Sequence, residues 1–161
     1  MIRPANPDDA AAIAAIYAPY VRDTVITFEE VPPTPDEIAA RIEEIHGASL
    51  PYLVAAQGDA VVGYAYAAPW RARSAYRYSV ETSIYLAPER IGQGIGTRLY
   101  DTLLDLLKQA GLHAAIGGIT LPNAASIALH ERLGFRRVAQ FEQVGFKQGR
   151  WLDVGYWQRL L

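Results

Sequence analysis

The chain has 161 residues, enough for a single domain with a substantial core. Hydrophobic residues make up 51% and charged residues 20%, and the net charge is −2, which excludes a disordered chain and argues against a nucleic-acid partner. There is no cysteine, so disulfides, thiolate metal sites and a cysteine nucleophile are excluded.

No apolar stretch reaches membrane-spanning length, and residues 1–4 lack the pattern of a signal peptide, so we expect a cytoplasmic protein. The three histidines, His46, His113 and His130, do not have the spacing of metal ligands, so we expect no metal. No repeat or linker divides the chain, and one domain over residues 1–161 is expected.

The first half of the chain predicts two helices and then antiparallel strands. Pro19 should kink or stop the first helix, while Thr34 and Glu37 have capping-box spacing and Gly47 should end the second helix. The expected elements are a strand over 2–4, helices over 7–21 and from Pro35 to Gly47, a hairpin of 52–56 with 60–67, and a strand over 76–86.

The second half alternates strand and helix. Its strongest helix is predicted over 94–110, with Ile95, Leu99, Leu103, Leu106 and Ala110 aligned on one face and Gly111 as its cap. The remaining elements are a strand over 113–119, a helix over 123–133 stopped by Gly134, and strands over 135–144 and 152–160 joined near Gln148-Gly149. This order predicts an α/β (α+β) fold, a mixed and mostly antiparallel sheet with helices on both faces.

Residues 89–97 carry three alternating glycines, Gly92, Gly94 and Gly96, directly before the strongest helix. Glycine lets successive backbone N–H groups turn toward one anion, and the helix N-terminus adds unpaired donors and a positive dipole end. A dinucleotide fingerprint would place its third glycine at Thr97 or Leu99, and a P-loop would need a lysine, so both patterns fail. A plain helix cap needs fewer glycines, so a pyrophosphate site is favoured.

Glu81 lies in the apolar strand before this loop. A carboxylate buried among Tyr78, Val80 and Ile84 would have a raised pKa and could serve as a general base. An exposed glutamate on the polar face of the sheet is an equally good interpretation from these residues alone. Arg71 and Arg73, which precede the strand, suit the bidentate binding of a carboxylate or phosphinate, although Arg71 alone is better explained as an ordinary surface arginine.

The glycine loop, its helix, the Asn123 helix and Leu133-Gly134-Phe135 resemble the GNAT superfamily of N-acetyltransferases. Three further segments, APWRARSAY at 68–76, VETSIY at 80–85 and GFKQGRWLDVGYW at 145–157, are similar to the phosphinothricin and methionine sulfoximine N-acetyltransferases. The resemblance covers nearly the whole chain. It departs at Ile91, where the superfamily usually has glutamine or arginine.

The resemblance implies acetyl-CoA as the acetyl donor and names two groups of site residues. On the cofactor side these are the backbone of Ile84, Tyr85 and Leu86 for the pantetheine arm, the loop residues Gly92, Gln93, Gly94, Ile95, Gly96 and Thr97 for the pyrophosphate, and Asn123, which also suits an N-cap. On the substrate side they are Phe28, Arg71, Arg73, Ser74, Ala75, Tyr76, Thr82 and Ser83, with Phe28 equally suited to the core.

The resemblance favours Glu81 as the base, acting directly or through one water. It gives His130 a secondary role, as proton donor to the thiolate or as a substrate ligand, whereas a solvated helix histidine is the usual explanation. No tyrosine occurs within 123–133, so the superfamily's common tyrosine acid is missing there.

The predicted function is acetyl-CoA-dependent N-acetylation of a small anionic amino-acid analogue, by direct transfer in a ternary complex. Two alternatives are an acetyltransferase acting on a protein N-terminus or another amine, and a non-catalytic acyl-CoA-binding module. Family members are commonly dimers, and Trp151, Tyr156 and Trp157 suit either a dimer interface or a core strand.

Overall fold

The computed structural model describes residues 1–161. Its elements, in chain order, are β1 (Ile2–Pro4), η1 (Pro7–Asp9), α1 (Ala10–Asp23), α2 (Pro35–Gly47), β2 (Tyr52–Gln57), β3 (Ala60–Pro69), η2 (Ser74–Tyr76), β4 (Ser79–Leu86), η3 (Pro88–Arg90), α3 (Ile95–Gln109), β5 (Ala114–Thr120), α4 (Ala124–Arg132), β6 (Arg136–Lys147) and β7 (Arg150–Leu160).

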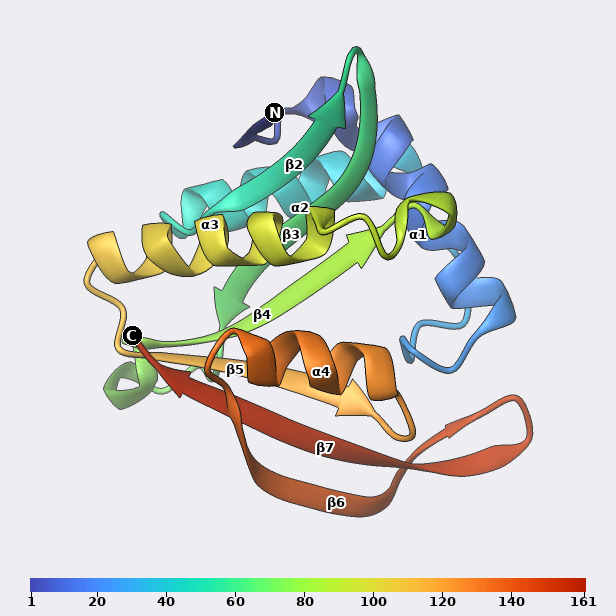
Figure 1. Ribbon diagram of the computed structural model, residues 1–161, viewed down its shortest axis with the longest axis vertical. Helices are drawn as coiled ribbons and strands as arrows, with labels where there is room; N and C mark the ends of the chain where they lie inside the picture. Colours follow the sequence, from blue (N-terminus) through green and yellow to red (C-terminus); the bar gives the residue numbers. More distant parts are fainter.

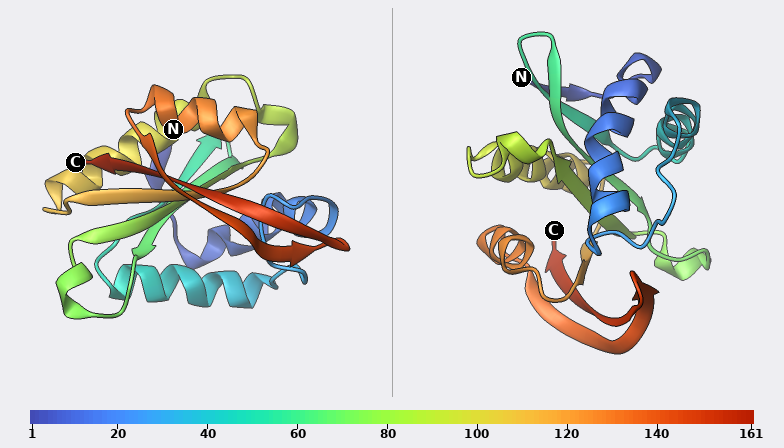
Figure 2. Two further views of the ribbon diagram at one scale, coloured as in Figure 1. Left: turned by 90° about the horizontal axis from the view of Figure 1, so that it is seen from below. Right: turned by 90° about the vertical axis from the view of Figure 1, so that its right-hand side faces the viewer.

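The strands form one seven-stranded sheet in the order β1-β2-β3-β4-β5-β7-β6. Every neighbouring pair is antiparallel except β4 and β5, which run parallel. Helices α1 and α2 cover one face, and α3 and α4 cover the other (Figures 1 and 2). The prediction of a mixed, mostly antiparallel sheet with helices on both faces is therefore confirmed.

The core lies between the sheet and its helices, in a cluster of 32 buried residues. On α3 the buried stripe runs through Leu99, Leu103 and Leu107, which repeat every four residues as a helix requires. Leu106, expected on that stripe, is 37% exposed, and Ala110 lies at the surface. None of the helices combines the length and apolar character needed to cross a lipid bilayer.

Three predicted boundaries were wrong. Helix α1 does not stop at Pro19 but continues to Asp23, because its buried residues, such as Tyr17 and Val21, pack on either side of the proline. The strand expected from Tyr76 begins at Ser79, because Ser74–Tyr76 form a 3-10 turn in which the Arg77 N–H donates to the Ser74 carbonyl.

The last hairpin is longer than expected. Gln148 and Gly149 both have positive φ, 53° and 75°, which allows a tight two-residue turn. Pairing therefore continues to Lys147 and Arg150 at the turn itself. The register of β6 shifts between Phe141 and Gly145, near Gln143 with its positive φ of 50°.

Candidate active site

An opening in the sheet lies between β4 and β5. The two strands pair only where Ser79–Glu81 meets Ala114–Ile116, and beyond Glu81 they diverge (Figure 1). Residues after Glu81 therefore have one backbone edge that pairs with β3 and a second edge that no strand covers. The opening is lined by β4 and β5 residues together with Asn123, Ser126 and His130 of the α4 segment.

The glycine loop stands at one end of this opening. Gly92 and Gly94 have φ of 84° and 75°, and Gly94 is the residue that precedes α3. The N–H groups of residues 92–97 donate no hydrogen bond within the protein. A Cβ on Gly96 would lie 3.3 Å from the Leu86 side chain, so the glycine lets the helix approach β4 closely. These unpaired donors at a helix N-terminus form an anion-binding concavity.

A cleft of about 460 Å³ connects the glycine loop with the opening. The predicted cofactor residues that line it are Ile84, Tyr85, Leu86, Gly92, Gly94, Gly96, Thr97 and Asn123. The Ile95 side chain instead lies in the core, and the Gln93 side chain donates to the Glu89 carbonyl, so only the backbones of these two face the loop.

Two polar groups along the cleft are already engaged. The Leu86 carbonyl accepts a hydrogen bond of 2.7 Å from the Tyr20 hydroxyl. The Asn123 side chain accepts one of 3.1 Å from the Ser126 N–H and so acts as the N-cap of α4. Asn123 nevertheless lines both the cleft and the opening.

Successive side chains of β4 point to opposite faces of the sheet. Glu81, Ser83 and Tyr85 lie on the face of α1 and α2, opposite Ala68, Tyr66 and Tyr64 of β3. Thr82 and Ile84 lie on the face of α3 and α4, where Thr82 contacts Tyr100 and Ile84 lies near Gly96.

Glu81 is half-buried and forms no salt bridge. Burial raises the pKa of its carboxyl, and the positive charge of Arg71 opposes that rise. The predicted neighbours were partly wrong, because Tyr78 is 52% exposed and Ile84 points to the other face. A Cβ on Gly118 would lie 3.5 Å from Glu81 Oε1 and 3.2 Å from the Tyr156 ring, so this glycine leaves space between the carboxylate and the aromatic ring.

Arg71 is held on an aromatic stack beside Glu81. Its guanidinium lies 5.0 Å from the centre of the Trp70 ring, and that ring meets Tyr156 edge-on at 5.7 Å. Stacking of this kind fixes a guanidinium while leaving its N–H groups free to bind a carboxylate.

The other predicted substrate residues lie farther out. Arg73, Ser74 and Tyr76 line a neighbouring depression that they share with Arg71, and Ala75 is exposed on the same turn. Phe28 lies on the segment between α1 and α2 and packs against Gly145, where any Cβ would meet the tip of its ring. Ser83 thus lines the opening and Glu81 lies on the same face of β4, whereas Arg71 lines the depression that holds Arg73, Ser74 and Tyr76.

Thr82, Tyr100 and His130 form a buried hydrogen-bonded chain on the opposite face. The Tyr100 hydroxyl lies 2.6 Å from Thr82 Oγ1 and 3.0 Å from His130 Nε2. His130 Nδ1 lies 2.7 Å from the Ser126 carbonyl, which can only accept, so Nδ1 carries the proton. Burial lowers the pKa of His130, while its bond to Ser126 opposes that shift. The neutral imidazole therefore accepts from Tyr100 through Nε2.

Sequence reasoning missed Tyr100, Tyr20 and Ile26, which line the site or support it. Tyr100 did carry a signal, because it is a phenol on the apolar stripe of α3 and a buried hydroxyl needs a partner. Ile26 lies on the irregular segment after α1, where no periodicity indicates which way a side chain points.

Comparisons with known proteins agree with this geometry. The family model of the acetyltransferase (GNAT) domain matches residues 2–155. The phosphinothricin N-acetyltransferase of Alcaligenes faecalis is 44% identical, over 99% of this chain and 82% of that protein. The L-methionine sulfoximine/L-methionine sulfone acetyltransferase of Salmonella typhimurium is 40% identical, over 98% of this chain and 92% of that protein.

The crystal structure of a phosphinothricin acetyltransferase from Sinorhizobium meliloti in complex with AcCoA has the same fold, with a TM-score of 0.96 and 43% identity. The match covers 100% of this chain and 88% of that one. By its sequence, its fold and the arrangement of its glycine loop, the chain belongs to the GNAT family of acetyltransferases.

Proposed function

We propose that this protein transfers the acetyl group of acetyl-CoA to the α-amino group of a small amino-acid analogue of the methionine sulfoximine or phosphinothricin type. The observation that carries the proposal is the set of unpartnered N–H groups at residues 92–97, connected by a cleft to Ile84, Tyr85 and Leu86 of β4, the strand that also carries the unpaired carboxylate of Glu81. The curated relatives named above carry this activity in their names. Acetylation of such compounds would confer resistance to them.

The residues present fit the proposed coenzyme. The N–H groups of residues 92–97 would hold its pyrophosphate, and the uncovered edge of β4 at Ile84 and Tyr85 would pair with the pantetheine arm as an added strand does. Bound acetyl-CoA supplies the thioester-linked acetyl group. A backbone N–H near Ile84 would stabilise charge on the acetyl oxygen.

Glu81 would accept a proton from the incoming ammonium group, directly or through one water, and so produce the neutral amine that can attack. Its raised pKa suits this task. Arg71, with Arg73 behind it, would orient the α-carboxylate beside Glu81. The chain has no cysteine, so direct transfer in a ternary complex is the simplest route.

The secondary role of proton donor does not fit His130 as it lies in the fold. Its one ring proton, on Nδ1, is bonded to the Ser126 carbonyl and its Nε2 accepts from Tyr100, so His130 would hold the Tyr100 hydroxyl in place rather than donate a proton. The same bonds argue against a role as a substrate ligand.

Steady-state release of CoA tests the activity, with L-methionine sulfoximine as acceptor at saturating acetyl-CoA. Saturable turnover supports the proposal. Tight acetyl-CoA binding without turnover on any amine would indicate the binding module, and preference for a peptide would indicate an acetyltransferase of protein N-termini.

A glycine substitution tests the anion cradle separately. Gly94→Ala strains a residue with φ of 75° and should turn donors away from the pyrophosphate, so acetyl-CoA binding should weaken roughly 10- to 100-fold for one lost charge-assisted hydrogen bond. Gly58→Ala is the matched control, because Gly58 has φ of 59° in the distant β2–β3 turn. Equal binding by both variants would contradict the cradle.

We also propose that the protein acts in the cytoplasm as a homodimer joined through β6 and β7. Of the aromatic residues expected at such an interface, Trp151 is 63% exposed and lies beside Phe146, whereas Trp157 is in the core and Tyr156 packs on Trp70. Light scattering on Trp151→Ser should show a monomer if this face joins two copies.

A further inference from the structure

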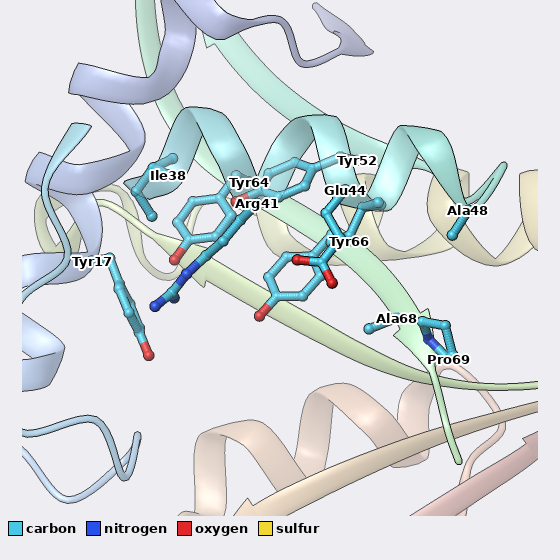
Figure 3. A pocket seen from close by; sticks show the side chains of 11 residues that line it. Tyr17, Ile38, Arg41, Glu44, Ala48, Tyr52, Tyr64, Tyr66, Ala68 and Pro69 are labelled. Atoms are coloured by element: carbon cyan, nitrogen blue, oxygen red, sulfur yellow. The ribbon is translucent and has the colours of Figure 1, made fainter. Parts of the chain in front are cut away.

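A second pocket, of about 210 Å³, lies between α2 and the sheet, away from the coenzyme cleft (Figure 3). Its floor is formed by three stacked tyrosines, Tyr52, Tyr64 and Tyr66, whose ring centres are separated by 4.9 to 6.3 Å. Arg41 and Glu44 reach it from α2, as the sticks in Figure 3 show.

Two of these phenols have hydroxyl groups that the protein leaves unsatisfied. Tyr52 and Tyr64 are each only 2% exposed, yet neither hydroxyl makes a hydrogen bond within the protein. The hydroxyls of Tyr17, Tyr20 and Tyr100, in contrast, all have partners. Neither hydroxyl is among the fully enclosed polar atoms that lack a partner, so both face the pocket and are free to donate to a group that enters it. Burial also raises the pKa of both phenols, which therefore remain donors at neutral pH.

The pocket ends beside the proposed base. Ala68 lines it and lies directly opposite Glu81 in the antiparallel pairing of β3 and β4, and Tyr66 lies opposite Ser83. Directly opposite residues share a face of the sheet, with Cβ atoms about 5 Å apart. A group bound beside Glu81 can therefore extend across Ala68 into the tyrosine pocket.

The charges around the pocket add up to a negative excess. Arg41 is paired with Glu29 through hydrogen bonds to both carboxylate oxygens, so its guanidinium is already neutralised. The buried Lys147 faces Glu29 and Glu30 and donates to the Thr27 carbonyl. Glu44 forms no salt bridge and adds one further negative charge at the pocket wall.

On the basis of the proposed function, we infer that this tyrosine pocket holds the side chain of the acceptor amino acid and selects a neutral side chain ending in hydrogen-bond-accepting oxygens. A sulfone or sulfoximine has this chemistry, whereas the phosphinate of phosphinothricin carries a negative charge toward Glu44. The pocket of about 210 Å³ leaves room for a small side chain of this kind. The protein is therefore a methionine sulfone type of acetyltransferase in preference to a phosphinothricin type.

The first test compares three acceptors at saturating acetyl-CoA, namely L-methionine sulfone, phosphinothricin and L-alanine, which has no group to enter the pocket. We expect kcat/KM for the sulfone to exceed that for phosphinothricin. A kcat/KM for phosphinothricin equal to or above that for the sulfone would overturn the inference.

The second test removes single polar groups. Tyr64→Phe keeps the ring and deletes one unpaired hydroxyl, so kcat/KM for methionine sulfone should fall about 3- to 10-fold while that for alanine is unchanged. Glu44→Gln should raise kcat/KM for phosphinothricin by up to about fivefold, because it removes a partly screened charge. Tyr78→Phe, which deletes the hydroxyl of a tyrosine that is 52% exposed, is the matched control. An equal loss on alanine and the sulfone in Tyr64→Phe would mean that Tyr64 is only structural.

Equilibrium binding separates this inference from the proposed function. If no amino acid is turned over, the proposed function fails, but calorimetric binding of L-methionine sulfone in the presence of CoA still reports on the pocket. Binding that Tyr64→Phe weakens would support the pocket on its own. No binding of the sulfone, or binding unaffected by Tyr64→Phe, would overturn it.

Discussion

Neighbouring residues of β4 are in opposite chemical environments. On the face of α1 and α2, Glu81 is half-buried, has no hydrogen-bond partner and meets a charge only at Arg71. On the face of α3 and α4, Thr82 is buried and bonded to Tyr100, which in turn is bonded to His130. The alternation of a single strand thus separates a reactive group, left free, from a supporting network in which each polar group has a partner.

The largest effect should come from substituting Glu81, on the face of α1 and α2. Glu81→Gln removes the proton acceptor but keeps the shape, so kcat should fall by about 10²- to 10⁴-fold, as expected for loss of a general base. Acetyl-CoA binding, measured by calorimetry, should be unchanged. Glu43→Gln, on the exposed side of α2, is the control. A kcat for Glu81→Gln within twofold of the original would show that Glu81 is not the base.

Substitutions in the hydrogen-bonded chain of Thr82, Tyr100 and His130 should lower the free energy of unfolding. Tyr100→Phe leaves His130 Nε2 without its partner, while the Thr82 hydroxyl keeps its bond to the Ile116 carbonyl, and an unsatisfied buried group costs about 1–3 kcal/mol. Urea denaturation should detect this loss, whereas Tyr78→Phe at an exposed position should change the free energy of unfolding by less than about 0.5 kcal/mol. If both variants unfold at the same urea concentration, the network contributes nothing.

The network also predicts a dependence of stability on pH. Burial lowers the pKa of His130 below its ordinary value of 6.5. Between the lowered pKa of the folded state and 6.5, the unfolded chain binds a proton that the folded chain does not. The free energy of unfolding therefore falls as the pH is lowered through this window. The contribution is fully present above pH 6.5. Denaturation at several pH values should show this slope, which His130→Gln removes and His46→Gln, at an exposed histidine, retains.

The smallest effect concerns Arg71, the one charge that acts on Glu81. Arg71 opposes the rise in the pKa of Glu81, so Arg71→Ala should raise that pKa further. Because the base works only when deprotonated, activity is lost below its pKa, and the acidic limb of the kcat profile should move to higher pH. Arg77→Ala is the control, because Arg77 lies over Tyr78. A limb unmoved by Arg71→Ala would mean that Arg71 does not act on Glu81.

Features encoded by neighbouring residues were predictable from the sequence. The glycine loop, the start of α2 at its capping box and the Gln148-Gly149 turn all depend on local backbone preferences. Alternation along β4 also predicts that the side chains of Glu81 and Thr82 point to opposite faces of the sheet.

Contacts between distant segments could not be predicted. Thr82, Tyr100 and His130 come from three elements, and their meeting depends on how α3 and α4 pack on the sheet. The tyrosine pocket likewise needs α2 laid across β2 and β3. Leu106 was predicted to be buried and is exposed, because the surface on which α3 packs decides which stripe of the helix is buried.

The short ladder between β4 and β5 has a mechanical consequence. Three residues of each strand are the only rungs that join the β1–β4 part of the sheet to the β5–β7–β6 part. A ligand that bridges the gap would join the two parts of the sheet where no strand pairing joins them. At a hundredfold excess over its Kd, such a ligand stabilises the folded state by about 2.7 kcal/mol.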